Sequence, residues 1–308
     1  MNSADSQPPP ATQRKTYVLS AVLTALSWLP LPALHALGRL TGRLFWYLPT
    51  RERDITRTNL ALCFPEQSDR ERERLGLNSL EHTGRALWEI AAMWRWPQAR
   101  LQKLIVREVN REIFDEALAL NRGVILASPH IGAWELITTH IGCRHPMINM
   151  YRPSRSRAMD PIVCQARSRF GSQNAPATPR GVRMVLKALH EKKVVGILPD
   201  QEPDREGGVF APFFGQPACT MTLLCKLAAR ARAPVVFCVM KRLKSGYEMH
   251  YLKSPPTLCD SDPQTAATAL NAMVEACVRC GPEQYLWSYK RFSLLPEGGK
   301  RRYRPRRR

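Results

Sequence analysis

The spacing of hydrophobic and polar positions changes along the chain and separates three regions. The first is an apolar run over residues 16–38 that contains no Asp, Glu, Lys or Arg. In the second, apolar residues recur at near-helical intervals, which predicts helices over Arg51–Leu62 and Asp69–Trp96. The longer of these begins after a capping Ser68 and ends at Pro97. From residue 104 onward, short apolar runs alternate with helical patterns.

This third region predicts an α/β fold with a mostly parallel central sheet flanked by helices, because strands and helices alternate in it. The predicted strands are Gly123–Ser128, Met147–Tyr151, Val194–Leu198, Pro234–Met240 and an edge strand over Tyr247–Leu252. The predicted helices are Gly132–Ile141, Asp160–Phe170, Arg180–Glu191, Pro217–Arg232 and Pro263–Cys280. The predicted organisation is a flexible leader (1–15), a membrane-associated helical extension (16–48), one α/β domain (49–297) and a basic tail (298–308).

The apolar run of residues 16–38 is long enough for a membrane helix, since about 20 helical residues cross a bilayer core. Pro30 and Pro32 interrupt it. A single membrane anchor is the favoured interpretation, and a re-entrant or interfacial helix is the second. A cleaved secretory signal is the third, although no small-residue cleavage site follows the run. A pair of ordinary packing helices also fits the pattern.

The net charge of the chain limits the classes of partner that we expect it to bind. Forty-six Lys and Arg against 26 Asp and Glu give a formal net charge of +20, which favours an acidic partner: nucleic acid, an anionic membrane or an acidic protein. Seven basic residues lie in the tail of residues 300–308, as expected for a disordered arm or an attachment to anionic lipid or nucleic acid. Seven more arginines and one acid, Asp160, lie between Arg152 and Arg183, and we expect that cluster to line a site.

Cysteine usage argues against a disulfide framework or a metal centre. The nine cysteines are odd in number and mostly lie within apolar runs, as reduced core thiols do. Cys277 and Cys280 form the only close pair, and no second pair completes a zinc site. We therefore predict no metal or redox function at these cysteines.

The candidate chemistry follows the first predicted strand, since sites in such sheets gather beyond the carboxyl ends of strands. His130 lies in the turn after Ser128, and Glu135 lies in the first turns of the next helix, with Gly132 between them. A carboxylate that fixes the imidazole tautomer would make His130 a general base. A hydrogen-bonded structural histidine is the alternative interpretation.

No enzyme nucleophile accompanies this pair in the sequence. The chain has no G-x-S-x-G elbow, and the spacing of His130, Glu135 and His140 does not match the zinc motif H-E-x-x-H. A base without a nucleophile indicates direct attack by a hydroxyl of the substrate.

His130-x4-Glu135, which follows Ala127-Ser128-Pro129, resembles the H-x4-D/E motif of glycerolipid-type acyltransferases. More specifically, the chain resembles the late (secondary) lipid A acyltransferases of Gram-negative bacteria, the lauroyl and myristoyl transferase family. The segments that carry this resemblance, over roughly residues 15–297, are Tyr151-Arg152-Pro153, Gly196–Gln201, Gly208–Ala218 and Pro282–Phe292.

The resemblance implies transfer of a fatty acyl chain from acyl carrier protein to a hydroxyl of the 3-hydroxyacyl chain of a lipid A precursor. It implies no cofactor, acyl-ACP as co-substrate with acyl-CoA as a possible donor, and a place on the cytoplasmic face of the anionic inner membrane. We expect no nucleic-acid partner, since no zinc finger or RNA-binding motif is present.

The resemblance also assigns roles to residues. His130 is the expected base and Glu135 its partner, without an acyl-enzyme. Arg167 and Asp200 match an essential arginine and aspartate of the family, although Arg169 lies two residues from Arg167. Asp200 is expected to organise the Arg and His side of the site; an ion pair with an arginine or a strand-end turn are the other interpretations.

Arg152 and Gln201, within the matching segments, are further predicted substrate-binding residues. Two other functions stay open from the sequence: a phospholipid or aminolipid acyltransferase with the same motif, and a basic nucleic-acid-binding protein. The usual phosphate-binding pattern of the former is absent near Leu198–Gln201.

Overall fold

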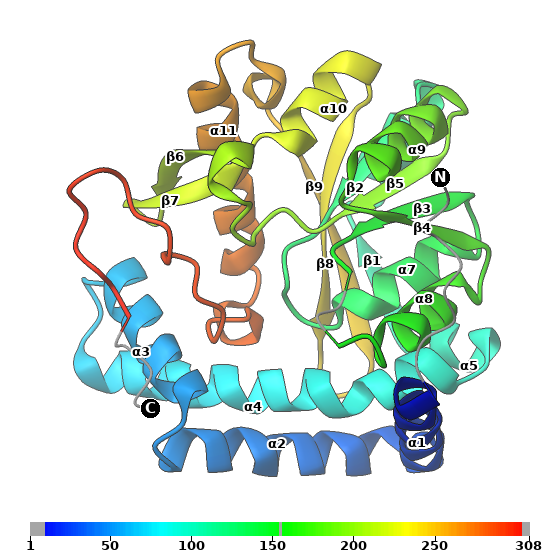
Figure 1. Cartoon of the computed structure of the whole chain (residues 1–308), viewed down its shortest axis with the longest axis vertical. Coiled ribbons are helices and arrows are strands. Elements are labelled where there is room, and N and C mark those ends of the chain that lie inside the picture. The colour runs from blue at the N-terminus through cyan, green and yellow to red at the C-terminus, as the bar shows by residue number, and fades with distance from the viewer. Residues whose placement is uncertain (1–9, 154–155, 304–308) are drawn as a thin grey trace.

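The computed structural model describes residues 10–153 and 156–303. The predicted leader and basic tail therefore lie partly outside the described residues. A twisted sheet forms the centre, helices cover both of its faces, and a layer of N-terminal helices lies along one end (Figure 1).

The central sheet has the strand order β1-β9-β8-β2-β5-β3-β4 in the described part of the chain. Its strands are β1 (Ile105–Val109), β2 (Val124–Ala127), β3 (Met147–Tyr151), β4 (Ser172–Pro176), β5 (Val194–Ile197), β8 (Val235–Arg242) and β9 (Tyr247–Lys253). All neighbouring pairs are parallel except β8 and β9. The prediction of a mostly parallel sheet flanked by helices is confirmed.

Two predicted elements are wrong. Tyr247–Leu252 is not an edge strand, because β9 lies between β1 and β8. The helix predicted over Pro217–Arg232 is a strand in its first part: β6 (Gly208–Phe213) and β7 (Gln216–Met221) form an antiparallel hairpin, and α10 covers only Leu223–Ala231. Gly215, at φ +73°, makes the turn between the two strands.

The two faces of the sheet bury separate cores, because successive residues of a strand point to opposite faces. On β2, Ile125 and Ala127 face one core and Val124 and Leu126 face the other. The first core is closed by α9 (Pro179–His190), α10 and α11 (Pro263–Arg279). The second is closed by α4 (Asp69–Arg95), α5 (Gln98–Gln102), α6 (Glu112–Ala119), α7 (Trp134–Gly142) and α8 (Asp160–Ser168).

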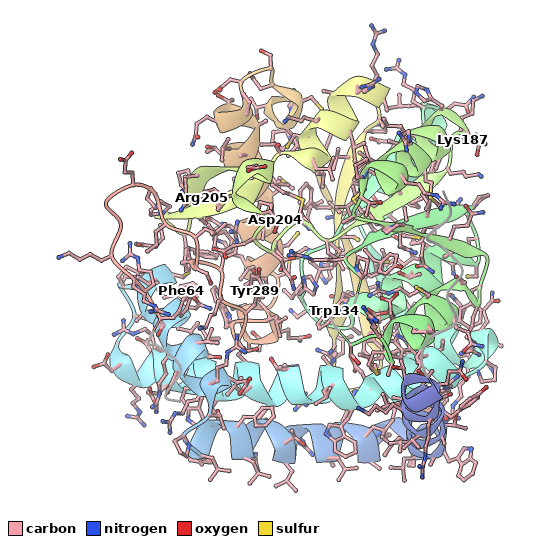
Figure 2. All side chains as sticks on the ribbon, viewed as in Figure 1. Phe64, Trp134, Lys187, Asp204, Arg205 and Tyr289 are labelled. Carbon is pink, nitrogen blue, oxygen red and sulfur yellow. The ribbon has the colours of Figure 1, made fainter. Side chains whose placement is uncertain are left out.

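The N-terminal layer consists of α1 (Pro10–Ser27), α2 (Leu31–Tyr47) and α3 (Arg51–Cys63), with α4 lying between α2 and the sheet (Figure 1). Lys187 on α9 is at the opposite end of the molecule from this layer, whereas Trp134 lies near α4 (Figure 2). The backbones of α2 and α4 touch: a Cβ atom on Gly84 would lie 2.0 Å from the carbonyl oxygen of Gly38. Glycine at this crossing therefore fixes α2 against α4.

No helix among the described residues is by itself long and apolar enough to cross a membrane. The segments Thr12–Ser27 and Leu31–Tyr47 satisfy the length and composition test only together, and they are bent by 116°. The favoured prediction of a single membrane anchor thus finds no single matching helix in the part of the chain that is described, and the interfacial or re-entrant alternative remains a prediction.

The C-terminal segment returns to the N-terminal layer before the described residues end. Tyr303 is buried, its hydroxyl donates to Asn59 Oδ1 on α3 (2.6 Å), and the same hydroxyl accepts from the Phe292 amide (3.0 Å). The chain is therefore packed as far as Tyr303, five residues past the start of the predicted basic tail.

Candidate active site

The register of the central strands brings two predicted site residues together. Strands β2 and β5 are parallel neighbours, with Ala127 opposite Ile197. His130 follows Ala127 by three residues, and Asp200 follows Ile197 by three residues. Equal offsets beyond adjacent carboxyl ends place the two side chains at the same edge of the sheet.

Asp200 orients the His130 ring. Its Oδ1 lies 2.8 Å from His130 Nδ1, and its Oδ2 accepts from the His130 backbone N–H at 3.0 Å. Because an ionised carboxylate only accepts, Nδ1 carries the proton and Nε2 keeps a free lone pair. The Gln201 amide nitrogen lies 3.3 Å from Nε2, which fits an acceptor at that atom. In this tautomer, Nε2 is the ring atom that can take up a proton.

Glu135 has a different partner from the one predicted. Both its oxygens accept from the Arg167 guanidinium, through Nε at 3.1 Å and through Nη2, and the Trp94 indole N–H donates to Oε2 at 3.1 Å. The carboxylate that contacts the imidazole is that of Asp200. Of the Arg and His side that Asp200 is expected to organise, it contacts His130, and its functional role, like the catalytic role of Glu135, stays a prediction.

Three arginines of the predicted cluster between residues 152 and 183 have different partners, and Arg155 lies outside the described residues. Arg167 joins Glu135, whereas Arg169 donates to the last carbonyl oxygens of α4, at Trp94, Arg95 and Trp96. Arg169 therefore caps a helix. Arg152 forms an exposed pair with Asp204 at 3.1 Å, away from the contacts of His130, and its predicted role in substrate binding stays a prediction.

The two carboxylates of the site are held ionised. Burial alone would raise the pKa of Asp200, but the His130 ring and the hydrogen bonds from His130 outweigh it and lower that pKa. Burial likewise opposes ionisation of Glu135, and the Arg167 charge, with hydrogen bonds from Arg167 and Trp94, lowers its pKa below the usual value. Asp200 and Glu135 are thus both held as buried anions, Asp200 by His130 and Glu135 by Arg167.

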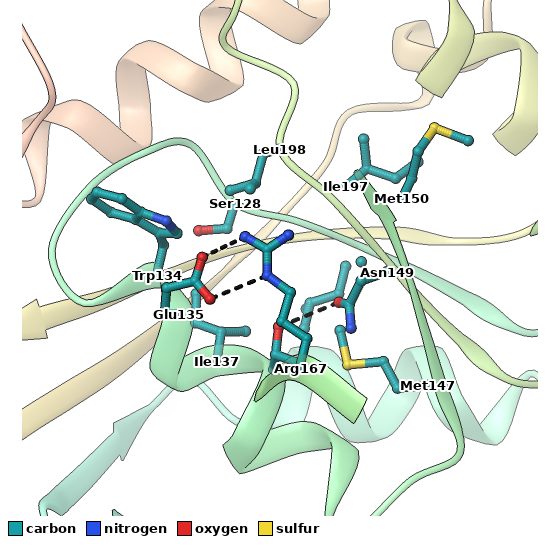
Figure 3. A pocket seen from close by; sticks show the side chains of 13 residues that line it. Ser128, Trp134, Glu135, Ile137, Met147, Asn149, Met150, Arg167, Ile197 and Leu198 are labelled. Atoms are coloured by element: carbon teal, nitrogen blue, oxygen red, sulfur yellow. Dashed lines mark hydrogen bonds and ion pairs between the residues drawn. The ribbon is translucent and has the colours of Figure 1, made fainter. Parts of the chain in front are cut away.

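A pocket opens beside these groups at the carboxyl ends of β2, β3 and β5 (Figure 3). The space between its walls, open solvent included, is about 410 Å³. Apolar side chains form most of its wall: Leu126, Ile137, Met147, Met150, Ile197 and Leu198. Figure 3 shows Glu135 and Arg167 paired among the lining side chains, with Ser128 and Trp134 near Glu135. An apolar pocket with a few convergent polar groups suits a ligand with a hydrocarbon part and a polar end.

Trp94 belongs to the site although the sequence did not single it out. It comes from α4, 41 residues before Glu135, and only the packing of α4 under α7 brings its indole N–H to the carboxylate. Among the described residues, no group of three or more His, Cys, Asp or Glu side chains is placed to hold a metal ion.

Acid should destabilise the fold through its buried carboxylates. Besides Asp200 and Glu135, the buried Glu89 on α4 has its pKa lowered to about 2: burial opposes this, and Arg242 and His35 overcome it. Since these folded-state pKa values lie below the unfolded ones, the stabilisation is complete above about pH 5 and is lost as the pH falls toward 2. For Glu89 alone it amounts to roughly 3 kcal/mol.

Urea denaturation at pH 7, 5, 4 and 3 checks this prediction. We expect a constant midpoint from pH 7 to 5 and a steep fall below pH 4; a midpoint that is unchanged at pH 3 would contradict it.

Fold and site together define a class: an α/β enzyme in which a carboxylate-oriented imidazole stands beside an apolar pocket at the carboxyl edge of a parallel sheet. The chain belongs to the bacterial lipid A biosynthesis acyltransferases, because the model of that family matches residues 11–293. It is therefore an acyltransferase, as the sequence predicts.

Curated relatives agree with this assignment. The chain is similar to a lipid A biosynthesis lauroyltransferase of Escherichia coli K12, with 31% identity over 94% of each chain. It is also similar to a palmitoleoyltransferase of lipid A biosynthesis from the same organism, at 33% identity over 88% of each chain. A myristoyltransferase from that organism is 28% identical over 84% of this chain and 79% of its own length.

Proposed function

We propose that this acyltransferase moves a fatty acyl chain from acyl carrier protein to a hydroxyl on a 3-hydroxyacyl chain of a lipid A precursor. The observation that carries the proposal is the contact between His130 Nδ1 and Asp200 at 2.8 Å, which leaves Nε2 available as a base. The His130 ring lies 5.3 Å from the ring of Trp134, which lines the apolar pocket. Family membership supports the lipid A precursor as acceptor.

His130 acts in one direct displacement. Its Nε2 takes the proton of the acceptor hydroxyl, replacing the contact with Gln201, while the oxygen attacks the thioester carbonyl carbon. The new C–O bond forms as the C–S bond breaks, and the imidazolium returns its proton to the departing thiolate. Asp200 stabilises the imidazolium and keeps the ring in the required tautomer. No acyl-enzyme is needed.

Arg167 places a positively charged group in the wall of the pocket. Two of its nitrogens hold Glu135, and burial of the pair strengthens its electrostatic field. We propose that Arg167 contacts a phosphate of the donor or acceptor and that the apolar wall receives the acyl chain. No cofactor is required, because a thioester already carries the activated acyl group.

The test combines donors and acceptors. Purified protein in detergent is given an acyl-ACP or the matching acyl-CoA, with a lipid A precursor that has free 3-hydroxyacyl hydroxyls or with a lysophospholipid, and products are followed by mass spectrometry. We expect acylated lipid A precursor from acyl-ACP and slower formation from acyl-CoA. Acylation of the lysophospholipid alone would favour the phospholipid acyltransferase and refute the proposal.

We further propose that the reaction takes place on the cytoplasmic face of the inner membrane, with α1 and α2 lying in the interface. On α2, Leu40, Leu44 and Tyr47 are exposed one helical turn apart, and on α1 Val18 and Val22 repeat the pattern. Exposed apolar stripes flanked by cations suit a surface of anionic lipid. Arg39 and Arg43, also exposed on α2, supply these cations.

The basic tail should add to this binding. Deleting residues 304–308 removes four arginines and spares Tyr303, which anchors the preceding segment to α3. At about 1 kcal/mol for each arginine near an anionic surface, binding to vesicles containing phosphatidylglycerol should weaken by roughly 10²–10³ at low salt. Vesicle co-sedimentation measures it, with neutral vesicles as control. Equal binding of both proteins to the anionic vesicles would refute a role for the tail.

A further inference from the structure

A second buried polar network lies behind the catalytic turn and has no part in the chemistry proposed above. Its centre is Glu89 of α4, of which 2% is exposed. Glu89 accepts from Arg242 at the end of β8 (Nε to Oε2, 2.9 Å), from the Tyr247 hydroxyl (2.9 Å) and from His35 Nε2 on α2 (2.9 Å). The network therefore joins the N-terminal layer, α4 and two central strands.

Arg242 also reaches the turn that carries His130. Its Nη2 donates to the carbonyl oxygen of Gly132 at 2.7 Å, and the same guanidinium holds Glu89. The Arg242 backbone exchanges two hydrogen bonds of 2.9 Å with the Gln284 side chain, and the Gln284 carbonyl accepts from the Gly132 N–H at 3.1 Å. Both polar groups of the Gly132 backbone thus depend on this network.

The backbone of the turn at Gly132 is sterically constrained. Gly132 has φ +59°, and a Cβ atom at that position would lie 2.0 Å from the Met240 carbonyl oxygen. The next amide, of Ala133, donates to the same Met240 oxygen at 2.8 Å. His130 stands two residues before Gly132 and Glu135 three residues after it. Any shift of Gly132 is therefore passed to both functional side chains.

The network also connects the proposed membrane layer with the turn. His35 lies one helical turn before Gly38, where the backbone of α2 touches that of α4. The opposite face of α2 carries the exposed Leu40 and Leu44. Only Glu89 and Arg242 separate His35 from Gly132.

We propose that Arg242 is a positioning residue for the turn between His130 and Glu135, and that Glu89 and His35 connect α2 to this turn through the same network. The proposal rests on the proposed function, since it assigns the network to acyl transfer. A buried ion pair contributes little net stability compared with apolar packing, so a positional role accounts for this cation better than stability does.

Arg242→Lys tests whether the Arg242 guanidinium is needed to hold Glu89 and the Gly132 carbonyl together. Lysine keeps a positive charge beside Glu89 but lacks the planar guanidinium that spans Glu89 and the Gly132 carbonyl. We expect kcat to fall about 10- to 100-fold with little change in KM, since small misplacement of reacting groups has effects of this size. Hydrogen–deuterium exchange of the backbone over residues 130–136 should become faster, while the core strands stay protected.

The chain offers a matched control in two tyrosines of β9. Tyr247 and Tyr251 are both fully buried, and each donates its hydroxyl to a glutamate, Glu89 and Glu108 respectively. Tyr247→Phe and Tyr251→Phe should lower the urea midpoint alike. Only Tyr247→Phe should also lower kcat and speed exchange over residues 130–136.

His35 completes the test. His35→Ala should reduce kcat in detergent, where no bilayer is present, and His35→Gln, whose amide can donate to Glu89, should restore most of it. If the wild-type protein forms no product, the proposed function is refuted. Hydrogen–deuterium exchange over residues 130–136 in the variants would still test whether the network positions the turn. Wild-type kcat in Arg242→Lys, or equal effects of the two tyrosine variants, would overturn the positioning role.

Discussion

Asp200→Asn is expected to lower the rate of acyl transfer by roughly 10³–10⁴, with the fold intact. Asparagine has nearly the same shape as aspartate, but it can present an amide N–H to His130 Nδ1. The ring would then carry its proton on Nε2, the atom that has to accept the hydroxyl proton, and the imidazolium would lose its counter-charge. Turnover measured by mass spectrometry checks the rate, and circular dichroism checks the fold.

Glu202→Gln is the control for this change. Glu202 lies two residues from Asp200 and is a carboxylate in the same loop, but its Oε1 accepts from the Ser293 and Leu294 amides and it makes no hydrogen bond to His130. We expect it to keep turnover within a few-fold of the wild type. If Asp200→Asn behaves as Glu202→Gln does, the orientation of His130 by Asp200 is not required.

Arg167→Ala should lower both the free energy of unfolding and the rate of acyl transfer. It leaves Glu135, of which 9% of the side chain is exposed, without its cation, and an unpaired buried charge costs about 3–5 kcal/mol. The variant also removes the positive charge from the wall of the pocket. Turnover should therefore fall by about 10- to 10²-fold, the size of one charge-assisted hydrogen bond. Urea denaturation and product formation give the two values.

A double variant separates these effects. Glu135→Gln with Arg167→Met removes both charges and should recover much of the lost stability, because no buried charge is then unpaired. It should not recover turnover. Recovery of turnover in the double variant would show that the pair acts only in folding, and that neither charge contributes to the reaction.

A repeated sequence pattern could have indicated the pairing of His130 with Asp200. Residues 124–130 (VILASPH) and 194–200 (VVGILPD) are both apolar strands followed by proline and then a polar residue, at identical spacing. Once the two strands are parallel neighbours, the register alone brings the histidine to the aspartate. Strand order is a non-local property, however, and the sequence by itself favoured the carboxylate five residues away.

Other features could not be deduced from local patterns. Strand β4 is made of Ser172-Gln-Asn-Ala-Pro176, which is too polar to be recognised as a strand and forms one through its pairing with β3. The hairpin of β6 and β7 depends on tertiary contacts: Asn271 of α11 donates to the Ala211 and Pro212 carbonyls. Arg167 and Arg169 look alike in sequence, and only the fold sends one to Glu135 and the other to the end of α4.

The most direct test of the account is the turnover of purified His130→Ala, measured beside the wild type as acylated lipid A precursor formed from acyl-ACP. The account predicts that the variant keeps its fold and loses about 10²–10⁴ in kcat, the contribution of a positioned general base. Turnover by His130→Ala within a few-fold of the wild type would contradict the assignment of His130 as the base.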